Sequence, residues 1–116
     1  MDSIRDLTTR INAFRDARDW KQFHNPKDMA VSICIESAEL LEQFQWKNAK
    51  ECETHLQENR EAVADELADV AIYLFELADL LQMDLGHEML RKLDNNAAKY
   101  PVEKARGSNL KYNRLD

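Results

Sequence analysis

A long apolar stripe with helical spacing is the feature that most constrains the fold of this chain. From about Asn59 to Gln82, apolar residues recur every three or four positions, as on one face of an α-helix; they are Val63, Leu67, Val70, Leu74, Leu77 and Leu81. The 116 residues include only two glycines and two prolines, too few turn formers for a many-stranded β fold. A hydrophobic fraction of 44% also argues against disorder. The sequence therefore predicts an all-α protein.

Start signals place three more helices. Ser3 followed by Asp6 resembles a capping box, and Asn25 with Pro26 combines a cap with a first-turn proline. Asp84 would cap the last helix, which a later proline stops. The expected helices run from about Ser3 to Arg18, from Asn25 to Trp46, and from Asp84 to Lys99.

Two segments outside these helices are expected to be irregular. Residues 47–60 are polar without periodicity and read as a loop or short helical turn, and residues 102–116 read as a polar tail. The chain shows no internal repeat or linker. One domain over residues 1–116, folded as a four-helix bundle-like unit, is the economical expectation.

The second expected helix is more apolar than a single buried stripe requires. Apolar side chains cover most of its circumference; they include Ile33, Cys34, Ile35, Leu40 and Leu41. In a monomer some of them would face water, so we expect a homo-oligomer, a dimer at least.

Charge and cysteine usage narrow the class of partner. A net charge of −6 provides no basic field for a nucleic-acid polymer. No run approaches the roughly 18 apolar residues of a membrane span, and the opening segment has no apolar core of a signal peptide. Cys34 and Cys52 form no disulfide framework. We expect a cytoplasmic protein with reduced thiols and no membrane partner.

Two glutamates interrupt the most apolar helix. Glu36 and Glu39 stand three residues apart and therefore project from one helical face. Such a pair on a surface helix is usually a solvated face. Here the surroundings are apolar, and a buried carboxylate must be paired or must bind a metal ion.

The apolar stripe carries a matching acidic pair. Glu66 and Asp69 also stand at i and i+3, and Tyr73 and Glu76 continue that face. Two antiparallel helices would bring the four carboxylates together, where only a cation could relieve their repulsion. An all-oxygen ligand set favours Mg²⁺ or Mn²⁺ over Zn²⁺. The Glu-x-x-His pairs of a di-iron bundle are missing from the sequence.

Such a metal site suits phosphate chemistry, which also needs cations and, for a nucleotide, a place for the base. The last expected helix carries a polar stripe that would serve this purpose or form an ordinary solvent face; it consists of Lys92, Asn96 and Lys99, with Tyr100 following. Trp20 and Trp46 would either pack in the core or stack on a base, and His24 would hydrogen-bond a base edge.

The acidic pairs and their flanking segments resemble a known family. "ESAE" and "ELAD", with 26 residues between them, resemble the metal-binding pairs of the all-α nucleoside triphosphate pyrophosphohydrolases of the MazG-like superfamily. Further segments resemble its dCTP pyrophosphatase branch in order and spacing; they are "RDWKQFHNPKDMA", "LLEQFQWK", "ELADVAIYL", "KLDNNAAKYP" and "ARGSNLKY". The resemblance spans roughly residues 10 to 112.

The resemblance implies a MazG-type bundle assembled as a dimer or a dimer of dimers, with active sites at subunit interfaces. It implies Mg²⁺-dependent hydrolysis of a (deoxy)nucleoside triphosphate, such as dCTP or a modified relative, to the monophosphate and pyrophosphate, in nucleotide pool control.

The resemblance also implies roles for individual residues. Metal binding falls to Glu36, Glu39, Glu66 and Asp69. Phosphate contacts fall to Lys92, Asn96, Lys99 and Tyr100, and base contacts fall to Trp20, His24 and Trp46. Tyr73 would neighbour the metal ligands, and either Glu36 or Glu39 would orient or deprotonate the attacking water.

Two alternatives stay open on the sequence alone. In the first, the chain is a non-catalytic helical interaction module whose carboxylates pair with lysines and arginines of a partner. In the second, it is a hydrolase of another pyrophosphate ester, such as a nucleotide sugar.

Overall fold

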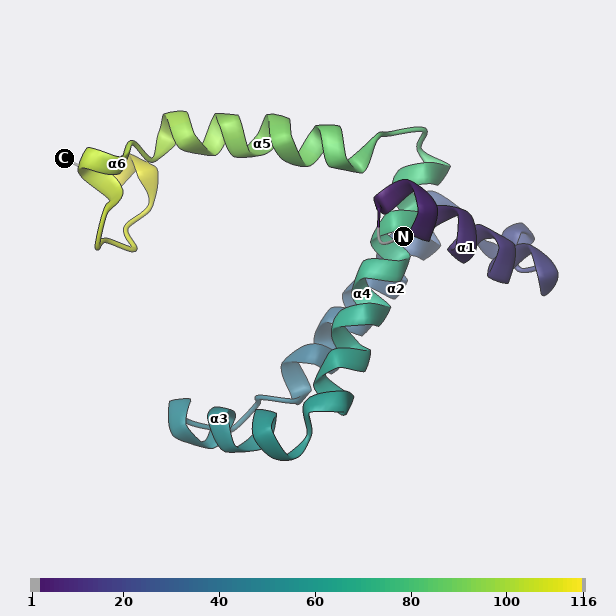
Figure 1. Ribbon diagram of the computed structural model, residues 1–116, viewed down its shortest axis with the longest axis horizontal. Helices are drawn as coiled ribbons and strands as arrows, with labels where there is room; N and C mark the ends of the chain where they lie inside the picture. The colour runs from purple at the N-terminus through teal and green to yellow at the C-terminus, as the bar shows by residue number, and fades with distance from the viewer. Residues whose placement is uncertain (1–2, 116) are drawn as a thin grey trace. The chain divides into compact units, whose positions relative to one another are not determined.

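The computed structural model describes residues 3–115 and is built from helices alone over that range (Figure 1). The elements are α1 (Ile4–Ala17), η1 (Lys21–Phe23), α2 (Pro26–Glu42), α3 (Ala49–Glu58), α4 (Arg60–Leu80), α5 (Leu85–Lys99), α6 (Val102–Ala105) and η2 (Tyr112–Arg114). The predicted all-α fold class is confirmed. None of the helices in this range combines the length and apolar composition of a membrane span.

The chain divides into two compact units, Met1–Met83 and Asp84–Asp116. The first unit contains α1 to α4, and the second contains α5, α6 and η2. A single domain over residues 1–116 stays a prediction.

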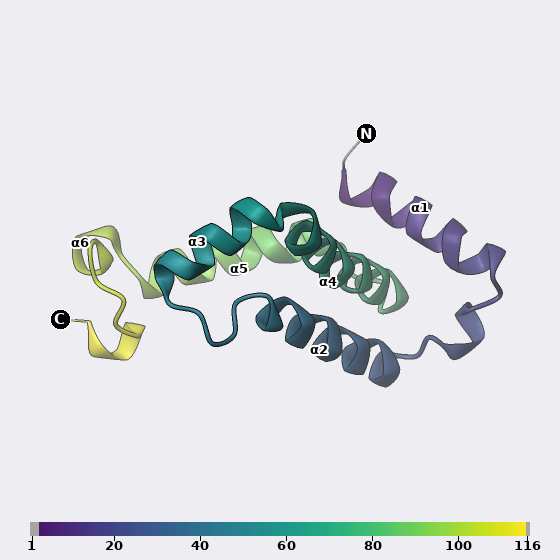
Figure 2. The ribbon, with the colours of Figure 1, turned by 90° about the horizontal axis from the view of Figure 1, so that it is seen from below.

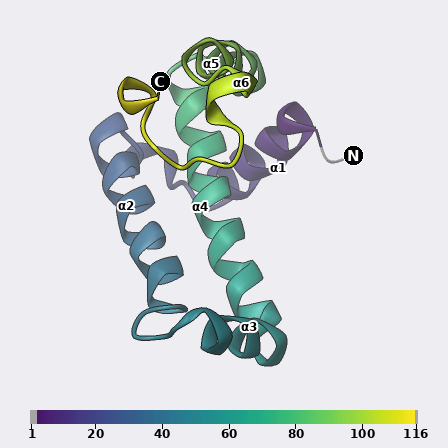
Figure 3. The same ribbon diagram turned by 90° about the vertical axis from the view of Figure 1, so that its left-hand side faces the viewer.

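The pairing of α2 with α4 organises the first unit. These helices have the most extensive packing contact in the chain, and they run antiparallel, side by side (Figure 3). Helix α1 also packs on α4, where Asn12 Nδ2 donates a hydrogen bond of 2.9 Å to Asp79 Oδ2. Helix α3 contacts α4 and connects the end of α2 to the start of α4 (Figure 2). Because α2 and α4 face each other along their lengths, the acidic pairs of both helices can meet.

The predicted helix starts are confirmed by side-chain caps. Ser3 Oγ accepts a hydrogen bond from Asp6 N (3.1 Å), and Asp84 Oδ1 accepts one from His87 N (3.0 Å). Asn25 Oδ1 accepts from the backbone N–H of Asp28 at 2.9 Å, with proline following at the first helical position. Each cap satisfies a backbone donor that the first helical turn leaves free.

The second predicted helix was too long at its carboxyl end. Helix α2 stops at Glu42, and the chain turns through Trp46 instead of continuing to it as a helix. Trp46 has a φ of +67°, in the left-handed region, which a right-handed helix cannot accommodate.

The expectation of a loop or short helical turn over residues 47–60 was wrong. Ala49–Glu58 form the ten-residue helix α3, which starts at a full capping box. Asn48 Oδ1 accepts from Glu51 N at 2.9 Å, and Glu51 Oε1 accepts from Asn48 N at 3.0 Å. His55 on this helix contacts the end of α2, where Gln43 Oε1 lies 2.8 Å from His55 Nε2. Local capping and these contacts stabilise a helix that lacks a strong apolar stripe.

The packing within one chain buries little apolar surface. Met29 and Val63 are the buried apolar residues among those described. The predicted stripe of α4 is only partly covered, and Val70 and Leu77 are half-buried. Three leucines spaced seven residues apart are exposed; these are Leu67, Leu74 and Leu81. The helices therefore leave a regular apolar row facing solvent.

Replacing the cap of α2 should reduce stability measurably. Asn25→Ala removes the acceptor for Asp28 N and should lower the free energy of unfolding by about 1 kcal/mol. Urea unfolding at fixed protein concentration measures the change. Asn25→Ser retains a neutral capping oxygen, although it loses the 2.7 Å bond from Asn25 Nδ2 to Asp28 Oδ2, and should lose less stability than Asn25→Ala. Equal losses in the two variants would contradict a capping role.

Candidate metal centre

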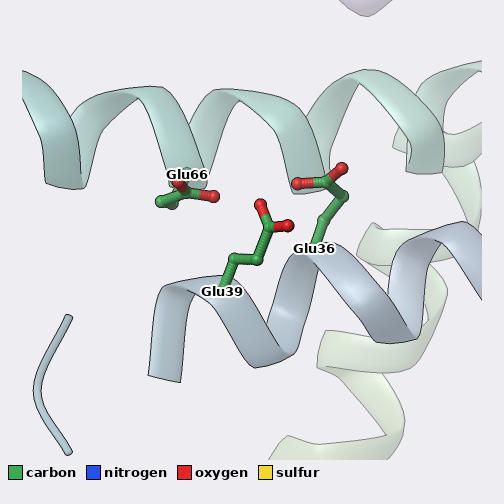
Figure 4. A group of neighbouring side chains, drawn as sticks. All are labelled: Glu36, Glu39 and Glu66. Atoms are coloured by element: carbon green, nitrogen blue, oxygen red, sulfur yellow. The ribbon is translucent and has the colours of Figure 1, made fainter. Parts of the chain in front are cut away.

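Three glutamates meet between α2 and α4. One carboxylate oxygen each from Glu36, Glu39 and Glu66 lie within 4.8 Å of one another (Figure 4). Glu36 and Glu39 extend from α2 toward α4, which carries Glu66. All three residues are half-buried. The i, i+3 spacing and the antiparallel pairing together create this acidic cluster.

Asp69 lies beside the acidic cluster. It follows Glu66 by one helical turn on α4 and is half-buried, and its charge contributes to the raised pKa of both Glu36 and Glu66. The group of three oxygens within 4.8 Å does not include an Asp69 oxygen. The structure therefore brings three of the four predicted ligands together and places the fourth nearby.

Burial and mutual repulsion disfavour the charged form of this cluster. Burial raises the pKa of Glu36, and the adjacent Glu39 carboxyl and the charges of Asp69 and Glu66 raise it further. Burial likewise raises the pKa of Glu66, followed by the effects of Glu39, Asp69 and Asp65. Like charges at short range destabilise one another unless a cation lies between them.

Two oxygens in the cluster have no hydrogen-bond partner within the described part of the chain. Glu36 Oε2 and Glu66 Oε2 are both buried from solvent, although buried polar atoms are normally paired. Over residues 3–115, neither Lys nor Arg forms an ion pair with the three glutamates. The carboxylates thus provide unshared oxygen atoms pointing into one small region.

Tyr73 lies on the same side of α4 as the acidic cluster. Burial raises the pKa of its phenol, and the charges of Glu36, Glu76 and Asp69 add to this effect. The phenol therefore lies among carboxylates from both helices, as a neighbour of the predicted ligands. Its contribution to the site stays a prediction.

His24 contacts the carboxylate of Glu76, a residue to which the sequence analysis assigned no function. Its Nδ1 atom pairs with Glu76 Oε2, joining the residue before Asn25 to the last part of α4. Glu76 had been recognised only as a continuation of the acidic face. Its spacing of seven residues from Asp69 was the available signal, but only the register of the two helices identifies His24 as its partner.

Both predicted base-binding tryptophans are exposed. Trp46 is 91% exposed, and Trp20 packs edge-on against Phe14 with ring centroids 5.7 Å apart. The Arg18 guanidinium carbon lies 3.7 Å from the Phe14 ring centroid and 6.0 Å from that of Trp20. The indole of Trp46 therefore has little packing contact within the described part of the chain.

The four predicted phosphate contacts belong to the second unit. Lys92, Asn96 and Lys99 lie on α5, and Tyr100 follows it. The ring of Tyr112 covers the last two: Lys99 Nζ lies 4.9 Å from its centroid, and the Tyr100 ring meets it edge-on at 6.2 Å. A role for these residues in binding phosphates stays a prediction.

Comparisons with known proteins agree with the geometry of the acidic cluster. A family model described as the MazG-like family matches residues 31–115, a range that contains both acidic pairs. The dCTP pyrophosphatase 1 of Rattus norvegicus is 37% identical over 115 residues, covering 97% of this chain and 68% of the rat protein. The dCTP pyrophosphatase 1 of Homo sapiens is 38% identical with the same coverage.

A solved structure shares both the fold and much of the sequence. A pyrophosphatase from Archaeoglobus fulgidus superposes with a TM-score of 0.80 at 42% identity, covering 84% of this chain and 91% of the archaeal one. These likenesses confirm the resemblance on which the site residues were predicted. The chain belongs to the MazG-like family.

Proposed function

We propose that this chain is a Mg²⁺-dependent pyrophosphohydrolase that converts a nucleoside triphosphate, dCTP or a modified relative, to the monophosphate and pyrophosphate. The observation that carries the proposal is the acidic cluster, in which buried oxygens of Glu36 and Glu66 have no partner among the described residues. Its support from relatives is the name dCTP pyrophosphatase 1. These names confirm the expected enzyme class, a nucleoside triphosphate diphosphatase.

The residues of the cluster fit a hard divalent cation. Glu36, Glu39 and Glu66 offer only carboxylate oxygens, with Asp69 beside them, and such ligands suit Mg²⁺ or Mn²⁺. Burial and then the neighbouring carboxylates raise the pKa values of Glu36 and Glu66, and among residues 3–115 neither Lys nor Arg forms an ion pair with them. When bound, the cation would neutralise phosphate charge and promote ionisation of the attacking water.

The chain's own residues would divide the remaining work. Water would attack the α-phosphorus, and the bond from that phosphorus to the bridging oxygen would break, leaving pyrophosphate. Either Glu36 or Glu39 would orient the water and take its proton. In the proposed site, Lys92, Asn96, Lys99 and Tyr100 bind the phosphates, while Trp20, His24 and Trp46 contact the base.

We further propose that the working form is a homo-oligomer. The exposed leucines of α4 stand seven residues apart, a spacing typical of helices that pack together along a seam. Each such side chain would gain about 1.5–3 kcal/mol on full burial. The outer face of α2 adds exposed Val31, Ile35 and Leu41. A second copy of the chain would cover these rows.

Neutralising one cluster carboxylate should abolish turnover while preserving the fold. Glu39→Gln keeps the side-chain shape but removes a charge that would hold the cation or accept the proton, so kcat/KM for dCTP should fall by at least about 100-fold. Chromatography of the products would show loss of both dCMP and pyrophosphate. Glu42→Gln, an exposed residue one turn later on α2, is the matched control. Equal activity in the Glu39 variant would exclude the cluster as the active site.

The metal-free protein should lose stability as pH rises above the ordinary glutamate pKa of 4.5. Folding raises the pKa of Glu36, so the folded state retains a proton that the unfolded state has lost, and stability falls as that proton dissociates. As the pH rises from 4.5, Glu36→Gln should flatten this decline in Tm, and Mg²⁺ should reverse it in the wild type. Identical profiles for wild type, Glu36→Gln and the Glu42→Gln control would contradict the raised pKa.

The wild-type chain should have two or four times the mass of one chain in solution. Light scattering after size-exclusion chromatography measures this mass. Leu74→Glu places a charge in the exposed leucine row and should shift the population toward smaller species, because a buried unpaired carboxylate is costly. Gln57→Glu adds the same charge on exposed α3 and should leave the mass unchanged. A monomeric wild type would contradict the proposed assembly.

A further inference from the structure

Glu76 is a buried carboxylate that the proposed reaction does not use. It is 4% exposed, one of two buried charged residues among those described, the other being Arg15. It lies near the carboxyl end of α4, outside the acidic cluster. Burying a carboxylate without compensation is strongly unfavourable. Its retention therefore requires a partner, and the structure supplies one.

The partner is the imidazole of His24. Nδ1 of His24 pairs with Glu76 Oε2, and the imidazole side chain keeps 19% of its surface exposed. An ionised carboxylate can only accept a hydrogen bond, so Nδ1 must carry the proton. Within the described chain, Nδ1 is the ring nitrogen with a hydrogen-bond partner. A neutral ring held in this way presents Nε2 as a hydrogen-bond acceptor.

The pair lies along the same face of α4 as the acidic cluster. Seven residues, close to two full turns, separate Glu76 from Asp69, which corresponds to roughly 10 Å along the helix. Tyr73 stands between them, and its raised pKa reflects the charges of Glu36, Glu76 and Asp69 after the effect of burial. A continuous row of polar groups therefore leads from the cluster to His24. A nucleotide with its phosphates at the cluster would extend its nucleoside along such a row.

We propose that Glu76 is a positioning residue that fixes the proton of His24 on Nδ1, so that Nε2 accepts a hydrogen bond from an exocyclic amino group of the base. The proposal rests on the proposed function and names a basis for its substrate preference. A 4-amino pyrimidine offers Nε2 a donor. A 4-oxo pyrimidine places an oxygen lone pair against the nitrogen lone pair, and such a mismatch discriminates between ligands.

The test compares dCTP with dUTP, whose bases differ in the group at position 4, amino against oxo, and in the proton that uracil carries on the adjacent N3. Glu76→Gln preserves shape but allows the side chain to donate as well as accept, so the ring is no longer held in one tautomer. We expect the ratio of kcat/KM for dCTP to that for dUTP to fall by about three- to tenfold, the worth of one neutral hydrogen bond. The ¹⁵N NMR spectrum of histidine-labelled protein should show a neutral ring with Nδ1–H in the wild type and a mixture of tautomers in the variant.

A matched control and a second variant separate this role from a structural one. Asp79→Asn removes a carboxylate one turn further along α4, which also accepts a hydrogen bond, from Asn12, and should change neither readout. His24→Gln should lower the same ratio, and adding Glu76→Gln in that background should lower it no further, because Glu76 acts through His24. A purely structural pair would reduce both activities equally and leave the ratio unchanged.

Several results would overturn the inference. One is a wild type that hydrolyses dCTP but whose ratio of kcat/KM for dCTP to kcat/KM for dUTP is unchanged by Glu76→Gln. A wild type that prefers dUTP, or whose His24 carries its proton on Nε2, would do the same. A wild type that hydrolyses neither nucleotide would instead refute the proposed function, and this inference with it.

Discussion

Repulsion among carboxylates is the constraint on which the rest of this structure depends. Glu36, Glu39 and Glu66 are held close together because α2 and α4 pack along their lengths, yet their proximity works against that packing. Burial raises the pKa values of Glu36 and Glu66 most, and the neighbouring carboxylates raise them further. Like charges that the fold holds close together typically mark a functional site, where stability is given up for ligand binding.

The same two helices combine three kinds of surface. Toward each other they present the acidic cluster, and further along α4 Glu76 pairs with His24, which lies just before α2. On other sides they expose apolar residues such as Leu41 and Leu67. In the function we propose, these surfaces serve metal binding, base selection and assembly. A substitution on either helix is therefore expected to affect more than one property, and control variants on the same helix are needed to separate them.

Sequence reasoning recovered what depends on local spacing. The i, i+3 pairs identified the helix faces that carry the acidic cluster, and Asn25 and Asp84 identified two helix starts, because these signals are complete within a few residues. The helix α3 was missed although its capping box at Asn48 was present, because the segment lacks apolar periodicity. The pairing of His24 with Glu76 depends on the register of segments 52 residues apart, which no local pattern encodes.

The ring of Tyr112 has a practical consequence for anyone who trims or tags this protein. The segment after Pro101 is polar, and composition alone would mark it as dispensable. In the structure it returns to α5, where Tyr112 lies against the ammonium group of Lys99 and the edge of Tyr100. A shortened expression clone ending before residue 112 would leave Lys99 without its aromatic neighbour. A truncation at the carboxyl end should therefore retain Tyr112, and a tag should be attached after it.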